Sequence, residues 1–329
     1  MQHQYKLAKY PLLLLWFIIF IVGCKKEEYS IPDPVNQLSN DVIKRTLGPN
    51  IVSLPIEFAY AMAVPKSKGK IVSAQVEASI AGATGTYLEN NSYSTNSSGQ
   101  DAAVRVGTPS VNDGNKTKVT FNVDTNAATL RYFYVIPEEA RSKTVSFIFS
   151  ATSSDGVTVT YNMGPYNISK MDIVRNLKVT SADSSYISIA DMTVYNGNSV
   201  AANAGKIDLV YLYRAAPAAF THAFVSPAAD AQYLPGVTLP AGVNKSTKIR
   251  KVFNLQDYNL ARINVGIYID DKDFQEINLS DQPNYAIGLR AEAGTWVETA
   301  DSKYRAYIFL NSVNANGSAV ISMLRYPLQ

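Results

Sequence analysis

Apolar and polar residues alternate along much of the chain after residue 50. The alternation is clear in 70–80 and recurs in three further segments, 119–123, 145–149 and 157–161. Successive side chains of a strand point to opposite faces, so each segment predicts a strand with one face on a core and the other in water. Turn-rich strings at 89–100, 112–115 and 153–156 separate these strands.

One segment of this half departs from the alternation. Thr129–Ile136 is apolar or aromatic on both faces except at Arg131, which predicts a central strand. About six short strands in about 120 residues are typical of an immunoglobulin-like β-sandwich.

The second half also predicts strands, with less regular spacing. Asn314–Gly317 predicts a hairpin turn between the last two strands, and Ser199–Gly205 predicts a single helical turn. We expect a second β-sandwich with longer loops, so the fold class is all-β. The predicted strands are 177–180, 186–190, 207–214, 223–225, 263–270, 285–291, 304–310 and 319–326.

The junction between the halves is expected at 167–175, where the alternation breaks. The predicted organisation is a signal peptide over 1–23, a tether over 24–44, a first β-sandwich over 45–170 and a second over 171–329. Within and just beyond the tether, residues 40–47 predict at most a short helix, because Gly48-Pro49 would end it.

The start of the chain has the pattern of a secretory signal. Lys6 and Lys9 precede an apolar run of 12 residues, Pro11–Val22, whereas a membrane-spanning helix needs roughly 20. Ile21–Cys24 resembles a bacterial lipobox, which implies that Cys24 is acylated and becomes the mature N-terminus. The alternative is that Cys24 is a buried thiol at the end of a core helix.

This region of the sequence predicts that the protein is located at the outer membrane. The charged string Lys25–Glu28 is similar to the signal that sends lipoproteins of the Bacteroidota to the outer face of that membrane. We therefore expect a lipid-anchored protein that faces the cell exterior, with outer-membrane lipid as its first partner. The same string is also what a solvated tether would contain.

The amino-acid composition excludes several classes of partner and active site. Loss of 1–23 would leave 28 basic and 27 acidic side chains, so no nucleic-acid partner is expected. Cys24 is the only cysteine, and His222 is the only histidine after His3. Disulfides, a cysteine nucleophile and two-histidine metal sites are therefore excluded, and we predict no metal, no cofactor and no enzymatic activity.

The remaining candidate groups each have a structural alternative. Asp270–Asp273 could bind Ca²⁺, but it lacks the spacing of a calcium loop, and a solvated turn is favoured. Glycosidase chemistry needs two facing carboxylates. Glu138-Glu139 fits the start of a helix better, and the sequence does not place Glu292 opposite Glu298. Trp296 is the candidate ligand-binding residue, as a stacking surface for sugar, and its alternative is a core tryptophan.

The chain resembles a domain-of-unknown-function family of Bacteroidota surface lipoproteins with two tandem β-sandwich domains. The resemblance implies the fold and the location but no established activity. More distantly, the layout is similar to glycan-binding lipoproteins that accompany outer-membrane polysaccharide importers, and to two-domain fimbrial subunits. The segments that carry the family resemblance are SAQVEASIAGATGTY (73–87), NSSGQD (96–101), PEEARSKTVSFIFSA (137–151), KIDLVYLYR (206–214) and RAYIFLN (305–311).

Two functions remain open at this point. The first is a non-catalytic binding or accessory module for glycan, with an outer-membrane importer as a further partner. The second is a fimbrial or adhesin-type structural subunit, which would polymerise by donating a strand to a neighbouring sheet.

Overall fold

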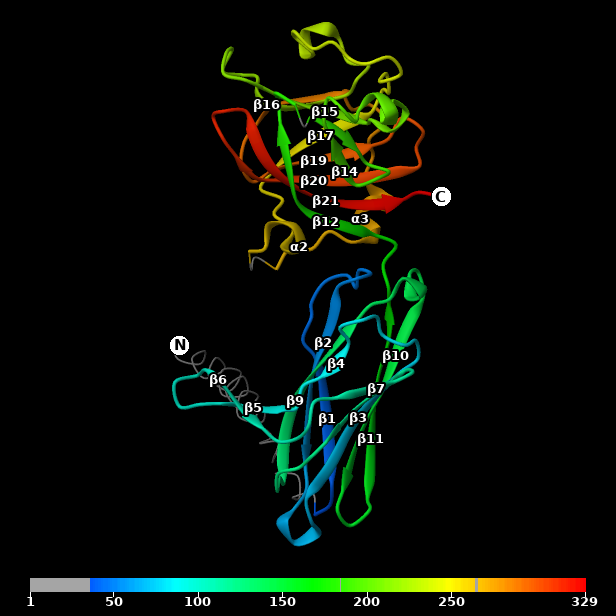
Figure 1. Ribbon diagram of the computed structural model, residues 1–329, viewed down its shortest axis with the longest axis vertical. Helices are drawn as coiled ribbons and strands as arrows, with labels where there is room; N and C mark the ends of the chain where they lie inside the picture. The colour runs from blue at the N-terminus through cyan, green and yellow to red at the C-terminus, as the bar shows by residue number, and fades with distance from the viewer. Residues whose placement is uncertain (1–35, 184, 264–265) are drawn as a thin grey trace, which may run out of the picture. The chain divides into compact units, whose positions relative to one another are not determined.

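The computed structural model describes residues 36–183, 185–263 and 266–329 (Figure 1). This part of the chain is mostly β and forms two β domains built from antiparallel sheets. The predicted signal peptide, Cys24 and Lys25–Glu28 lie outside the described residues. None of the helices in the described ranges is long and apolar enough to cross a membrane.

The first domain contains two sheets and one projecting hairpin. It also contains two 3₁₀ turns, Lys66–Lys68 and Glu138–Ala140. The hairpin consists of β5 (Asn91–Thr95) and β6 (Asp101–Arg105). The first sheet has the order β1 (Ser39–Lys44), β2 (Pro55–Ala63), β9 (Ala127–Val135), β4 (Tyr87–Leu88). The second has the order β11 (Thr158–Asn167), β10 (Thr144–Ser153), β3 (Ile71–Ala78), β8 (Lys116–Thr120), β7 (Val111–Asp113).

The two sheets of this domain share one core of aromatic side chains. Phe58 of β2 meets Phe147 and Phe149 of β10 edge to face, with ring centroids 4.9 and 5.2 Å apart. All three side chains are buried, and they belong to a single cluster that contains residues of both sheets. The inward positions are those that alternate along each strand, so the sequence pattern itself creates this core.

The second domain contains two five-stranded sheets. Its helical segments are short: a 3₁₀ segment Ala201–Lys206, another at Ala231–Tyr233, α2 (Tyr258–Ala261) and α3 (Asp271–Glu276). One sheet has the order β12 (Asp172–Thr180), β21 (Ser318–Pro327), β20 (Tyr304–Val313), β19 (Ala293–Glu298), β17 (Lys248–Phe253). The other has the order β14 (Thr193–Tyr195), β13 (Tyr186–Ser188), β15 (Leu209–Arg214), β16 (Thr221–Val225), β18 (Tyr285–Leu289).

The sheet that contains β20 is covered on both faces. Ile308 belongs to the core shared with the other sheet, whereas its neighbours Tyr307 and Phe309 belong to a second cluster with Phe274 of α3. All five residues 306–310 are therefore buried. A strand with both faces buried carries a continuous apolar run instead of an alternating one.

Several predicted elements are confirmed. Residues 129–136 correspond to β9, which lies between β2 and β4. Strands β20 and β21 form a hairpin, and Asn314–Gly317 is its turn, closed by a hydrogen bond from Gly317 N to Asn314 O of 3.0 Å. A 3₁₀ segment is present at Ala201–Lys206, where a helical turn was expected.

Two predicted elements are wrong. Residues 40–47 are not a short helix, because 39–44 form β1 and pair with β2, so they belong to the first sheet and not to the tether. No strand is present in the described residues of 263–270.

The structure explains why the alternation breaks near residue 175. Asn176 has a φ of 60°, and the register of β12 against β21 shifts between Val174 and Leu177.

Candidate functional site

The outer face of the first sheet carries small side chains at one end. Partners across an antiparallel ladder lie on the same face, and this face is opposite the core positions Val42, Tyr60 and Leu130. Small side chains leave a depression of about 440 Å³ here, which we call the sheet-face pocket. The two cross-strand rows of its floor are Ser39–Ala63–Ala127 and Asp41–Ala61–Thr129.

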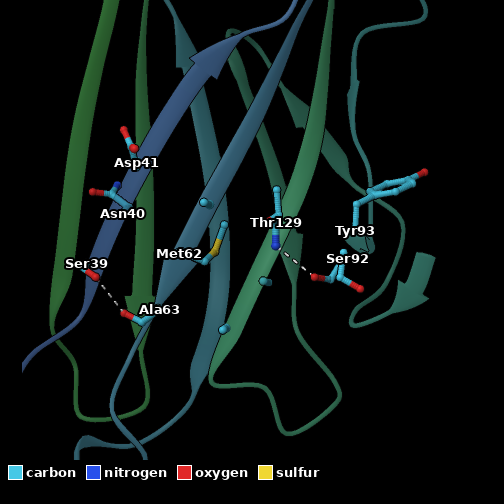
Figure 2. Close-up of a pocket in the computed structure, with 12 residues that line it drawn as sticks. Ser39, Asn40, Asp41, Met62, Ala63, Ser92, Tyr93 and Thr129 are labelled. Atoms are coloured by element: carbon cyan, nitrogen blue, oxygen red, sulfur yellow. Dashed lines mark hydrogen bonds between the residues drawn. The ribbon is translucent and has the colours of Figure 1, made fainter. Parts of the chain in front are cut away.

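The hairpin strand β5 forms one wall of the sheet-face pocket. Ser92, Tyr93 and Ser94 line it, and the Ser92 hydroxyl oxygen accepts a hydrogen bond of 3.0 Å from the backbone N–H of Thr129. Figure 2 shows Ser92 and Tyr93 on one side of the floor and Asp41 on the other. The pocket therefore lies between the edge strand β1 and the start of the hairpin.

Arg131 holds the hairpin against the sheet. Its guanidinium carbon lies 4.0 Å from the centroid of the Tyr93 ring, and the guanidinium also pairs with Asp101 of β6. Glu57 lies beside it, with 4.0 Å between Arg131 Nε and Glu57 Oε1, and pairs with Arg45 at 3.0 Å. Both hairpin strands are thus attached to one side chain, which is only 18% exposed.

Two buried polar atoms near Tyr93 make no hydrogen bond within the part of the chain that the structure describes. Glu89 Oε2 and Arg131 Nε are buried and have no hydrogen-bond partner among the described residues. A hydrogen bond between its phenol and the Glu89 carboxylate, together with burial, raises the pKa of Tyr93. An acceptor and a donor without partners cost free energy, about 1–3 kcal/mol each, unless a further group satisfies them.

A second aromatic surface lies farther along the same face. Tyr87 of β4 and Phe133 of β9 are cross-strand partners whose rings stack with centroids 4.9 Å apart and planes 14° apart. Tyr87 is 41% exposed. This face of the first sheet therefore offers flat rings beside a pocket and a set of ionised groups.

Trp296 lies in the core. Its side chain is 5% exposed and packs against Phe274 and Tyr307, with ring centroids 5.1 and 4.9 Å away. The expectation of an accessible stacking surface is contradicted by this burial. The alternative of a core tryptophan is the one the structure bears out, because α3, which is distant in sequence, covers the side chain.

The carboxylate candidates have structural roles. Asp270 is the N-cap of α3 and forms a reciprocal capping box with Asp273. Glu138 begins a 3₁₀ turn and pairs with Arg141, as the helix-start alternative expected. Glu298 pairs with Arg305 at 2.9 Å. Within residues 36–183, 185–263 and 266–329, no group of three His, Cys, Asp or Glu side chains is placed to hold a metal ion.

Sequence reasoning missed Tyr93 and the role of Arg131. Tyr93 lies in the string 89–100, which was assigned to a turn because of its Asn, Ser and Thr content. Arg131 was noted as the single charge in an otherwise apolar segment. A lone charge at an outward position of a central strand is the signal that could have directed attention to this face.

The fold and this face define a two-domain, mostly β protein with a candidate binding pocket on its first domain. The family model described as Domain of unknown function (DUF4466) matches residues 35–168, and the one described as Domain of unknown function (DUF8576) matches residues 169–328. The crystal structure of a DUF4466 family protein from Parabacteroides merdae is 48% identical, with a TM-score of 0.86. It covers 90% of this chain and 100% of its own. The chain belongs to the DUF4466 family.

Two further structural matches have low sequence identity and low TM-scores. Two crystal structures of BcpA, the major pilin subunit of Bacillus cereus, are each 9% identical with a TM-score of 0.28. They cover 85% and 88% of this chain and 62% and 67% of their own. Likeness at this level supports no argument about fold or function. No match was found among curated proteins.

Proposed function

We propose that this protein is a non-catalytic binding module for glycan and that the sheet-face pocket is its binding site. One observation carries the proposal: an open pocket of about 440 Å³, lined by Tyr93 and floored by small side chains, lies on the sheet face that also carries Arg131 and the stacked rings of Tyr87 and Phe133. Sugars bind through aromatic rings that stack on their apolar faces and through a few hydrogen bonds to their hydroxyls.

Further details of the proposal come from the sequence. We propose that residues 1–23 are a signal peptide, that acylated Cys24 anchors the protein in the outer membrane, and that Lys25–Glu28 directs it to the cell exterior. The two domains are proposed to be sandwiches of the immunoglobulin-like type. A tether between the lipid and β1 leaves the first domain free to meet a soluble or cell-bound polysaccharide.

The test is a glycan array probed with the purified chain, followed by calorimetric titration of any glycan retained. Ala61→Trp fills the pocket floor and should abolish binding, and Tyr93→Ala should weaken it by about tenfold or more, as loss of an aromatic anchor does. Ser150→Trp is the matched control, because Ser150 occupies an outward position of β10 on the other sheet. The proposal fails if no glycan is retained, or if Ala61→Trp binds as the control does.

A further inference from the structure

We infer that the second domain has its own ligand site, which takes the anionic group, carboxylate or sulfate, of an acidic saccharide. The site is a depression of about 550 Å³ where the ends of β15 and β18 meet the start of β16 and the turn of the β20–β21 hairpin. We call it the His222 pocket. It is independent of the sheet-face pocket, which lies on the first domain.

The tautomer of His222 follows from its hydrogen bond to Tyr211. The Tyr211 hydroxyl is 2.6 Å from His222 Nδ1 and has no other hydrogen-bond partner among the described residues. Tyr211 is completely buried, so its proton would lack an acceptor if Nδ1 were the donor. The hydroxyl therefore donates to Nδ1, and the imidazole carries its hydrogen on Nε2.

That Nε2–H is available to a ligand. His222 lines the pocket, and the described chain gives Nε2 no hydrogen-bond partner. His222 as a whole is 6% exposed, so the ring reaches the pocket by its edge. Burial lowers the pKa of His222, so the ring is a neutral donor at neutral pH.

Tyr213 and Arg290 add further donors to the His222 pocket. The Tyr213 ring lies 4.6 Å from the His222 ring, and its hydroxyl has no hydrogen bond to the described residues. Arg290 is exposed and is the only charged residue among the described ones that line the pocket. Its guanidinium carbon lies 5.0 Å from the centroid of the Phe253 ring, and its N–H groups have no carboxylate partner among the described residues. Lys251 is a second cation near the pocket. Its Nζ donates to the carbonyl of Ile287 at 2.8 Å, and Ile287 precedes Gly288, which lines the pocket.

The hairpin turn forms one wall of the pocket. A Cβ at Gly317 would lie 3.1 Å from Cδ1 of Tyr213, so the hairpin turn passes directly beside that ring. Asn314, at the start of the same turn, lines the pocket, and its amide nitrogen donates to the Ser318 hydroxyl at 3.1 Å. Convergent donors, a guanidinium and a flat aromatic ring fit an acidic sugar, whose anion would meet Arg290 and whose ring would meet Tyr213.

The test is titration calorimetry of the purified full chain with three probes: trigalacturonate, a sulfated chondroitin disaccharide and neutral galactobiose. We expect at least one charged probe to bind about tenfold or more tightly than galactobiose, and the two charged probes distinguish carboxylate from sulfate. Binding of neither charged probe, or equal binding of galactobiose, would overturn the inference. Inorganic sulfate that binds as tightly as the better charged probe would also overturn it, because the sugar ring would then contribute nothing.

Variants assign the site. Arg290→Gln and Tyr213→Phe should each weaken binding of the charged probe by about tenfold, because each removes one donor and keeps the bulk of the side chain. Arg105→Gln is the control for loss of a surface arginine, since Arg105 lies in β6 of the first domain. Ala61→Trp should leave this binding unchanged, so failure here and failure of the sheet-face pocket are distinguishable. Arg290→Gln binding like Arg105→Gln would refute the assignment.

Discussion

His222 couples the second domain to pH through its burial. Of the residues after position 3, it is the only side chain whose ordinary pKa lies near 6.5. Its side chain is 6% exposed, and burial lowers its pKa in the folded protein. The groups that contact the ring are Tyr211 and Tyr213 of β15.

The first prediction is a loss of stability on acidification that depends on His222. With a depressed pKa, the folded state binds the proton less tightly than the unfolded state. The contribution of His222 is therefore fully present above pH about 6.5 and is lost as the pH falls through the folded-state pKa. Denaturant unfolding of the wild type and His222→Gln should show a difference in unfolding free energy that falls between about pH 8 and pH 5. A difference that stays constant with pH would contradict this.

Single residues also show where sequence reasoning reaches its limit. Either role of Trp296 was consistent with its sequence, because a core position and a loop-proximal platform share the same local pattern. The burial of Trp296 is determined by α3, which lies at least twenty residues earlier in the sequence and covers that face of β19. The role of Arg131 was also not predictable from its local sequence. Its partners Tyr93 and Asp101 belong to a hairpin whose strands show no alternation of apolar and polar residues.

At the scale of elements, the β5–β6 hairpin of the first domain is attached to the sheet by a few side-chain contacts. Its core-facing area is small, because none of the residues 91–95 and 101–105 is buried. The pair between Arg131 and Asp101 and the stacking of Tyr93 on Arg131 are its main side-chain attachments. Local opening of such an element needs less free energy than global unfolding.

The second prediction concerns this hairpin. Asp101→Asn should increase amide hydrogen exchange over 91–105 while global stability changes by less than about 1 kcal/mol, because Asp101 is half exposed and such pairs contribute little. Asp113→Asn is the control, since Asp113 is an exposed acidic residue on β7. Faster exchange across β9 and β10 as well would show that the hairpin is instead part of the global folding unit.

Elements with a strong local pattern were predicted well, and those fixed by distant pairing were not. The β20–β21 hairpin has long apolar strands and an Asn-rich turn with glycine at its end, so local chemistry specifies it. Strand β1 has only Val42 on the core, and its conformation is decided by pairing with β2 across residues 45–54. Tertiary pairing of this kind overrides a weak local preference.

At the scale of the whole molecule, the mostly β character and the two domains follow from the sequence, whereas the binding face does not. The pocket on the first domain is made by side chains of β1, β2, β5 and β9, which no single segment contains. A small residue such as Ala61 does not by itself predict a pocket. It lines one here because β1 and β9 place further small side chains beside it.

The last prediction concerns the proposed attachment of the protein to the membrane by a lipid on Cys24. Cys24→Ser removes the thiol that acylation requires, and the apolar run before it has only 12 residues, against roughly 20 for a membrane-spanning helix. The variant should therefore move from the membrane fraction to the soluble fraction, as shown by fractionation and immunoblotting. Neutral residues in place of Lys25–Glu28 provide the matched control: that variant should remain lipidated and in the membrane but be less accessible to external protease. If Cys24→Ser sediments with membranes as completely as wild type, the protein is held there by something other than a lipid on Cys24.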